Sequence, residues 1–298
     1  MEVARHDSPT IARTAALTSA AMVAFACNSL LCRLALRDTA IDPASFTSIR
    51  LVAGAVALWL IVRLRHRGDT RATGGDWTSA VALFAYAAAF SFAYVSLPAS
   101  TGALLLFGAV QATMIGQGLR AGETFSAPRL AGLLLALGGL VGLLAPGWSA
   151  PPMGGALLML AAGVAWGWYS LRGKRRGGDP TAATAGNFLR AAPLALALSM
   201  LVSLGHHGPD IDAAGVAYAV LSGALASGVG YAVWYTALPS MRATTAATVQ
   251  LSVPVLTAIA GIALLDEPLT LRLLLASAAI LGGIALVIRR ARQPGGDG

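Results

Sequence analysis

The chain has 298 residues, of which 56% are hydrophobic and only 11% are charged, and its mean hydropathy is +0.70. Because a soluble domain carries about 25% charged residues, this chain lacks the polar side chains to cover a water-soluble globule, and its composition predicts an integral membrane protein. The formal charge of +8 does not indicate a nucleic-acid-binding protein, since the arginines form short clusters between apolar runs rather than a basic stripe.

Ten apolar stretches are long enough to cross a hydrocarbon core of about 30 Å as helices. In chain order they are residues 13–35, 43–62, 77–97, 99–119, 127–145, 152–171, 181–204, 213–237, 241–264 and 269–288. The first stretch resembles a signal sequence, but it is long enough to span the membrane and further stretches follow it. The connections are short, so no soluble catalytic domain is expected between the spans.

The basic residues predict how the spans are oriented. If the N-terminus is cytoplasmic, 16 lysines and arginines fall on the cytoplasmic side, and three (Arg33, Arg37 and Arg272) fall on the opposite side. This asymmetry in short loops predicts that both termini are cytoplasmic and that the number of spans is even. The expected fold is therefore an all-α polytopic membrane protein with ten transmembrane helices.

The sequence segment that ends the first half of the chain is repeated near the end of the chain. Residues 123–144 align with residues 267–288 without a gap, and the matches include Glu123 with Glu267 and Gly138-Gly139 with Gly282-Gly283. Five spans per half is an odd number, so the second copy must cross the membrane in the opposite orientation. We therefore expect two inverted five-helix repeats, residues 1–148 and 149–298, which is an arrangement suited to alternating access to a central site.

Two arginines lie well inside the predicted spans, where charged side chains usually face a cavity or a partner. Arg50 lies on the second span, and Arg190 lies on the seventh span three residues after Asn187, on the same helix face. Each arginine could bind a substrate carboxylate, with Asn187 beside the second one. The alternative is that each snorkels to lipid headgroups or bonds the carbonyls of a helix end.

Aromatic and amide side chains are further candidates for substrate binding. Tyr86, Phe90 and Tyr94 share one face of the third span at positions i, i+4 and i+8. The other candidates are Trp166 and Tyr169 on the sixth span, Tyr231, Trp234 and Tyr235 on the eighth, Gln111 on the fourth and Gln250 on the ninth. The rings could line a cavity or lie in an interfacial belt, and each buried amide must bond either a neighbouring helix or a ligand.

Acidic residues are absent from the spans, since all 13 fall in predicted loops or tails. No intramembrane carboxylate can then relay protons, so we expect facilitated transport driven by the substrate gradient. Glu123 and Glu267 precede the fifth helix of their halves, and each is expected to cap that helix. No nucleophile with a base, metal cluster or phosphate-binding loop is recognisable, so the sequence predicts neither an enzyme nor a cofactor.

Several motifs occur together over about residues 14–290. Each half has a loop glutamate followed three residues later by Ser126 or Thr270, a glycine-rich last helix and an arginine on its second span, and the second half adds the aromatic stretches 166–170 and 230–240. This assembly resembles the drug/metabolite transporter superfamily, EamA type, and looks most like its aromatic amino acid exporter branch. One departure is that residues 25–28, Phe-Ala-Cys-Asn, stand where such proteins often carry a tryptophan.

The resemblance implies a transporter that exports amino acids and related small metabolites across the bacterial inner membrane, with the fifth span of each half at the periphery. The sequence leaves open a multidrug, nucleotide-sugar or sugar-phosphate carrier, and also a non-transporting membrane sensor or assembly partner. The expected partners are a small-molecule substrate and the lipid bilayer, without nucleic acid. The oligomeric state, a monomer included, stays open.

Overall fold

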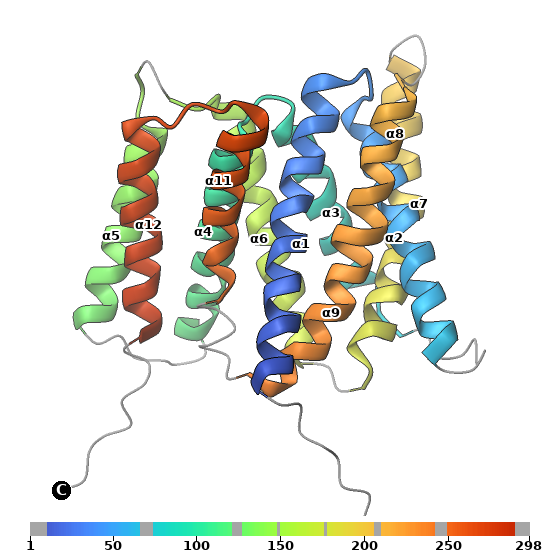
Figure 1. The fold of residues 1–298 in the computed structure, drawn as a ribbon, viewed down its shortest axis with the longest axis horizontal. Helices are drawn as coiled ribbons and strands as arrows, with labels where there is room; N and C mark the ends of the chain where they lie inside the picture. The colour runs from blue at the N-terminus through green and yellow to red at the C-terminus, as the bar shows by residue number, and fades with distance from the viewer. Residues whose placement is uncertain are drawn as a thin grey trace, which may run out of the picture.

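The computed structural model describes residues 11–65, 74–120, 127–147, 150–175, 178–205, 210–241 and 249–289, and within these ranges the chain forms helices and no strands. The helices form one bundle (Figure 1). Their bounds are α1 (Ile11–Asp38), α2 (Pro43–Arg65), α3 (Trp77–Tyr94), α4 (Ala99–Arg120), α5 (Ala127–Leu144), α6 (Met153–Arg175), α7 (Pro180–Gly205), α8 (Ala213–Val220), η2 (Leu221–Val229), α9 (Gly230–Ala237), η3 (Leu238–Ser240), α11 (Ser252–Leu265) and α12 (Leu271–Arg289).

Helix lengths and apolarity agree with a protein that crosses a membrane several times. Seven described helices have the length and composition of a membrane span, and three shorter apolar helices cover Leu130–Leu144, Ser252–Leu265 and Leu271–Val287. These three overlap the predicted spans 127–145, 241–264 and 269–288, and residues 242–248 of the span 241–264 lie outside the described part of the chain. The prediction of an all-helical, multi-pass membrane protein is confirmed.

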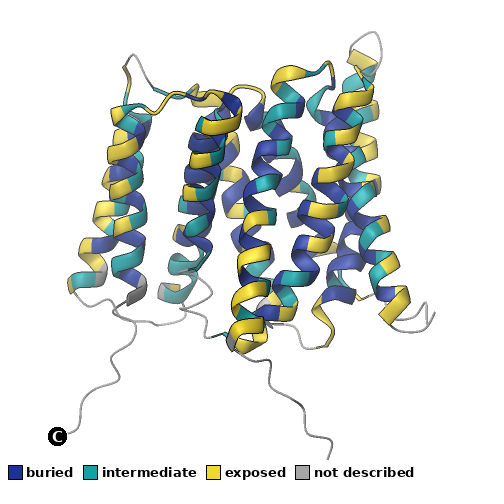
Figure 2. Cartoon of the chain, viewed as in Figure 1, coloured by how far each residue is buried: buried dark blue, intermediate teal, exposed yellow. Residues whose placement is uncertain are grey.

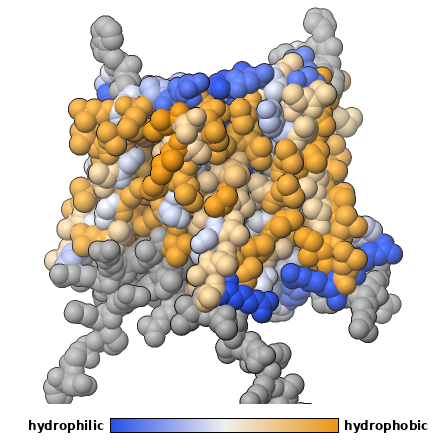
Figure 3. Space-filling view, viewed as in Figure 1, coloured by the Kyte–Doolittle hydropathy of each residue, from blue (hydrophilic) through white to orange (hydrophobic). Residues whose placement is uncertain are grey.

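The surface of the bundle has the polarity that a bilayer requires. Large apolar side chains such as Leu64, Met200, Leu204 and Leu264 are exposed. Figure 3 shows an apolar band over the helices, with hydrophilic side chains gathered toward the two ends of the bundle. Figure 2 shows the buried residues on the helix sides that face other helices, so the core lies between the helices and the apolar exterior is left for lipid.

The predicted span 213–237 is not one regular α-helix. It forms α8, a π-helical stretch η2 and α9. The middle of η2 lies so close to α2 that a Cβ on Gly223 would overlap the carbonyl oxygen of Arg50. A π-helical insertion re-aims the side chains that follow it and is frequent at functional sites, and the small residues of η2 permit this close approach.

The two last helices of the halves pack mainly on each other. α5 and α12 run side by side at one edge of the bundle (Figure 1) and form its most extensive helix pair. A Cβ on Gly139 would lie 2.7 Å from the Cβ of Ala279, whereas a Cβ on Gly138 would meet nothing within 4 Å. Only one glycine of the pair therefore serves the close helix contact.

The other helix pairs follow a regular scheme. α2 packs on α7 and α4 packs on α11, while α3 and α4 both pack on α6. α1 packs on α9, η2 and α11, and η2 also packs on α2. In Figure 1 the start of α1 and the end of α12 lie at the same end of the bundle, called the lower end here, and the opposite end is called the upper end.

Candidate functional site

Arg50 lies in the second turn of α2 and is the largest fully buried side chain in the described part of the chain, with 1% of its surface exposed. Its sequence position left open whether it snorkels to the headgroups, and this burial excludes snorkelling. The backbone of α2 comes close to η2 here because Gly54 and Gly223 carry no side chains between the two helices. The guanidinium is thereby held inside the bundle, away from lipid.

The guanidinium of Arg50 contacts neutral groups of α3. Its Nη2 donates a hydrogen bond to the Tyr86 hydroxyl at 3.1 Å. Its Cζ lies 5.3 Å from the ring centroid of Tyr86 and 4.9 Å from that of Phe90, which are cation–π distances. Within the described residues, Nε and Nη1 are buried and have no hydrogen-bond partner. A buried cation in this condition favours an anionic ligand.

Asn28 and Ser222 complete a buried polar network that the sequence reasoning missed. Asn28 Nδ2 donates to the Tyr86 hydroxyl at 3.3 Å, and Ser222 Oγ donates to Asn28 Oδ1 at 2.7 Å. The network therefore joins α1, α2, α3 and η2. An asparagine inside an apolar span is itself a signal of such a network, because an amide in lipid needs a partner.

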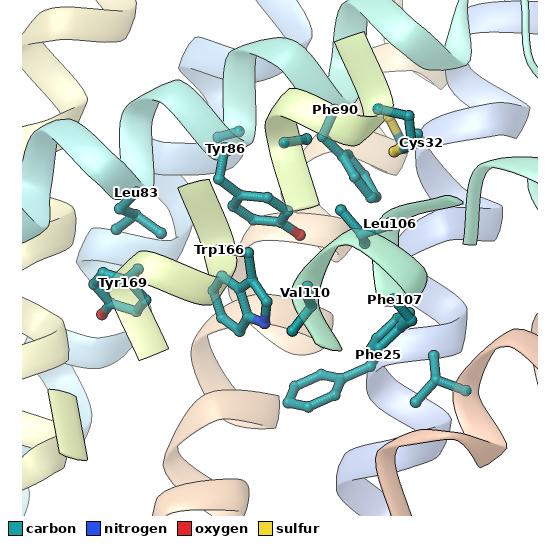
Figure 4. Close-up of a cluster of buried hydrophobic side chains, with 14 of the residues drawn as sticks. Phe25, Cys32, Leu83, Tyr86, Phe90, Leu106, Phe107, Val110, Trp166 and Tyr169 are labelled. Atoms are coloured by element: carbon teal, nitrogen blue, oxygen red, sulfur yellow. The ribbon is translucent and has the colours of Figure 1, made fainter. Parts of the chain in front are cut away.

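Aromatic rings from α1, α3, α6, α7 and α9 surround this network. Trp166 on α6 lies 4.9 Å from the Tyr86 ring and 5.0 Å from the Tyr231 ring, centroid to centroid. Figure 4 shows Tyr86 and Trp166 pointing toward each other, with Phe25 farther along the same cluster. Further ring contacts join Phe25 to Tyr231 and Trp234, and Phe188 to Tyr231. Phe25 and Phe188 were not among the predicted residues.

A second group of polar side chains lies at the lower end of the bundle. Asn187 Nδ2 donates to the Tyr169 hydroxyl at 3.3 Å, and its Oδ1 accepts from the backbone N–H of Asp76 at 2.9 Å. Arg172 forms an ion pair with Asp76 at 3.1 Å. Asp76, Tyr169, Asn187 and Tyr235 line a cavity of about 30 Å³. The group ties the start of α3 to α6 and α7.

The remaining predicted residues are placed elsewhere. Arg190 is half-buried and donates to the carbonyls of Gly74 at 2.9 Å and Gly186 at 2.8 Å, so it adopts the carbonyl-bonded alternative. Tyr94 donates to the Ala99 carbonyl near the upper end at 3.3 Å. Gln111 and Gln250 are buried on α4 and just before α11. Gln111 Nε2 has no partner among the described residues.

The expectation that Glu267 caps the helix that follows it is wrong. Its carboxylate accepts hydrogen bonds from the N–H groups of Ala99 and Ser100 and from the Ser100 hydroxyl. It therefore caps α4, because the folded loop brings it to that helix start rather than to α12. Glu123 lies outside the described residues.

The larger cavity lies at the upper end, away from Arg50. It measures about 360 Å³ and is lined by prolines, hydroxyls and leucines, among them Pro98, Ser100, Pro152, Thr270 and Leu273. It offers no charged side chain to a ligand. The stronger candidate site is therefore the central group of Arg50, Tyr86, Asn28 and the rings around them, although the cavity at the upper end is the larger open space.

Metal chemistry finds no support in the described residues. They contain no group of three or more histidine, cysteine or carboxylate side chains that could hold a metal ion. The arrangement around Arg50 instead offers charge-assisted hydrogen bonds to an anion and ring surfaces to an apolar group.

Comparisons with known proteins agree with this structure. The family model described as the EamA-like transporter family matches residues 153–289. Uncharacterized protein PA1977 from Pseudomonas aeruginosa is 61% identical over 277 residues, which cover 93% of this chain and 94% of that protein. A solved crystal structure with 20% sequence identity has a TM-score of 0.68 and covers 95% of this chain and 99% of its own, so the fold is shared.

Proposed function

Because this chain belongs to the EamA-like transporter family, we propose that it is a secondary transporter that exports amino acids and related small metabolites. Aromatic and apolar amino acids, as in the aromatic amino acid exporter branch of the drug/metabolite transporter superfamily, are the proposed substrates. The observation that carries this proposal is the buried Arg50, with its unpartnered Nε and Nη1, among Tyr86, Phe90, Trp166 and Tyr231. A guanidinium suits a carboxylate, and the rings suit an apolar side chain.

Alternating access between two inverted five-helix halves, residues 1–148 and 149–298, is the proposed mechanism. The helix pairing supports it, since exchanging the halves converts each of the most extensive helix contacts into another observed contact. α3 on α6 corresponds to α9 on α1, α4 on α6 corresponds to α11 on α1, and η2 on α2 corresponds to α3 on α7. The pairs α2–α7, α4–α11 and α5–α12 correspond to themselves, as pairs beside a pseudo-twofold axis would.

We also propose a topology, a cellular location, the partners and further lining residues. The proposed topology has ten spans and both termini in the cytoplasm of a bacterial cell, with the chain in its inner membrane. Substrate and lipid are the proposed partners, and a single chain contains the whole proposed path. Tyr169, Asn187 and Tyr235 are proposed to meet the substrate on its way to the cytoplasmic end, and Trp234, Tyr94, Gln111, Gln250 and Arg190 stay predicted lining residues.

Transport is proposed to run down the substrate gradient without obligatory proton exchange. The support is that the acidic side chains of the described helices lie at helix ends, as Asp38 and Asp76 do, and not among the residues around Arg50. A proton-coupled carrier would need a titrating group on the substrate path.

The test is flux through the purified full chain in proteoliposomes. Labelled phenylalanine, leucine and glutamate would be supplied with and without an imposed pH gradient, with protein-free vesicles as the control. Saturable movement of phenylalanine and leucine that does not depend on the gradient is the expected result. Strict one-proton exchange would refute the coupling mechanism. Absence of flux for every amino acid, with flux of a drug or phosphorylated metabolite, would refute the substrate class.

A further inference from the structure

We propose that the Arg50 site prefers carboxylates that lack an amino group, such as arylpropionates and 2-oxo acids, over zwitterionic amino acids of the same shape. This inference rests on the proposed function, because it selects among the amino acids and related metabolites that the transporter is proposed to move. Charge balance, the hydrogen-bond donors of the site and the use of its ring faces support it independently.

The charge of the site favours a monoanionic ligand. Among the described residues, Arg50 forms no ion pair with a carboxylate, and its hydrogen bond and ring contacts are with Tyr86 and Phe90. A monoanionic ligand therefore neutralises the buried guanidinium. A zwitterion would bring an ammonium with its carboxylate and leave one net positive charge inside the bundle, where a net charge is unfavourable.

The site around Arg50 has more hydrogen-bond donors than acceptors. Nε and Nη1 of Arg50 carry three N–H groups, and neither atom has a partner among the described residues. The Tyr86 hydroxyl already accepts from Arg50 and Asn28, and Asn28 Oδ1 already accepts from Ser222. A carboxylate supplies the acceptors that this site lacks. An ammonium would add three more donors to a site that has a surplus of them.

The aromatic rings nearest Arg50 are already in contact with its guanidinium. An ammonium can be stabilised over an aromatic face, but the guanidinium already lies over the Tyr86 and Phe90 rings at 5.3 and 4.9 Å. Trp166 and Tyr231 contact each other at 5.0 Å between centroids, and they offer an apolar surface to a ligand tail. The nearest ring faces are therefore used by the protein's own cation.

The test is binding, measured by isothermal titration calorimetry on the purified full chain, of three ligands with the same phenyl-ethyl skeleton. 3-Phenylpropionate has only the carboxylate, L-phenylalanine has both charged groups, and 2-phenylethylamine has only the ammonium. Binding is measured rather than flux because the neutral form of an arylpropionic acid crosses bilayers unaided. We expect 3-phenylpropionate to bind at least about tenfold more tightly than phenylalanine, as repulsion between two nearby cations requires, and phenylethylamine not to bind.

Variants test whether Arg50 is responsible for this preference. Arg50→Lys keeps the charge and should keep the order of affinities, whereas Arg50→Gln should reduce 3-phenylpropionate affinity about tenfold or more. Arg63→Gln is the matched control, since it removes an arginine from an exposed position on the same helix. The comparison of the three ligands on the unchanged protein stands even if an Arg50 variant does not fold.

The outcomes separate this inference from the transport proposal. Phenylalanine binding as tightly as 3-phenylpropionate would overturn the inference, while saturable phenylalanine flux in proteoliposomes would leave the transport proposal intact. A preference for 3-phenylpropionate that persists in Arg50→Gln would also overturn it. If neither ligand binds and no amino acid moves, both the inference and the proposed substrate class fail.

Discussion

Glu267 holds Ser100 by two hydrogen bonds, one from the Ser100 backbone N–H at 3.1 Å and one from its hydroxyl at 2.9 Å. Ser100 lies in the first turn of α4, whereas Glu267 lies in the loop before α12, near the other end of the sequence. The carboxylate is buried, with 7% of the residue exposed, and it satisfies N–H groups that a helix start leaves without partners. This contact joins the first half of the chain to the second at the upper end.

Replacing Glu267 by glutamine should destabilise the protein. The amide removes the negative charge from the start of α4 and turns an N–H donor toward one of the two backbone N–H groups, so we expect a loss of about 1–2 kcal/mol. Thermal unfolding of the purified protein in detergent measures the loss. Asp266→Asn is the control, because it removes the same charge from the neighbouring exposed residue, and asparagine tolerates the left-handed backbone there (φ 51°). Equal melting temperatures for the two variants would contradict the cap.

The glycine pair of α5 allows a sharper comparison. A Cβ on Gly139 would meet Ala279 and Ile280 of α12, whereas one on Gly138 would meet nothing within 4 Å. Gly139→Leu should therefore force α5 and α12 apart and lower the free energy of unfolding by about 1–3 kcal/mol. Gly138→Leu should have little effect or a slight stabilising one, since leucine is the better helix former. Melting temperatures of the two single variants provide the test. Similar losses of stability in both variants would refute the assignment of Gly139 to the face of α5 that contacts α12.

The sequence was sufficient to predict the class of fold. Apolar runs of about 20 residues have few structural solutions in lipid, and they predicted the helices to within a few residues at most ends. The role of Glu267 as a cap was also predictable from its place in a loop. Which helix it caps was not, because the start of α4 reaches it only through tertiary packing. Which glycine of the Gly138-Gly139 pair meets α12 was not predictable either, because it depends on the rotation of α5 about its axis.

The candidate site was predictable in composition but not in arrangement. Arg50 and Arg190 occupy equivalent positions in the two halves of the sequence, yet one lies among aromatic rings and the other bonds loop and helix carbonyls. The two arginines differ because their tertiary neighbours differ. Arg50 lies over the Phe90 ring of α3, whereas Arg190 bonds the carbonyl of Gly74 in a loop. The π-helical stretch could not be predicted, because its only sequence feature is a set of small residues, which are common in any membrane helix.

Gly223 of η2 should be intolerant of any side chain. A Cβ there would overlap the Arg50 carbonyl oxygen, and the neighbouring backbone of α2 cannot give way as a flexible side chain could. We expect Gly223→Ala to cost about 1–3 kcal/mol, despite the higher helix propensity of alanine. Gly116→Ala on α4 is the control, because a Cβ at Gly116 would meet nothing within 4 Å. Thermal unfolding gives the comparison, and a stable Gly223→Ala variant would show that η2 and α2 are packed less closely.

Tyr86→Phe isolates the hydroxyl that joins Arg50 to Asn28. The variant keeps the ring and its contacts but removes the acceptor of two buried donors, Arg50 Nη2 and Asn28 Nδ2. Unsatisfied buried donors are costly, so we expect a loss of about 1–3 kcal/mol in the free energy of unfolding. The guanidinium should also lose its fixed orientation, which should weaken carboxylate binding about tenfold.

Tyr94→Phe is the matched control for that variant. Tyr94 is another fully buried tyrosine of α3, and its hydroxyl donates one hydrogen bond of 3.3 Å to the Ala99 carbonyl. Tyr94→Phe keeps the ring that could line the substrate path and removes only a hydroxyl bonded to a carbonyl at the upper end. The variant should therefore cost about 0.5–1.5 kcal/mol and leave the affinity for 3-phenylpropionate unchanged. Calorimetric titration of both variants separates a general effect of a lost hydroxyl from a specific one. A fall in affinity of the same size in both would mean that the Tyr86 hydroxyl does not position Arg50 for the ligand.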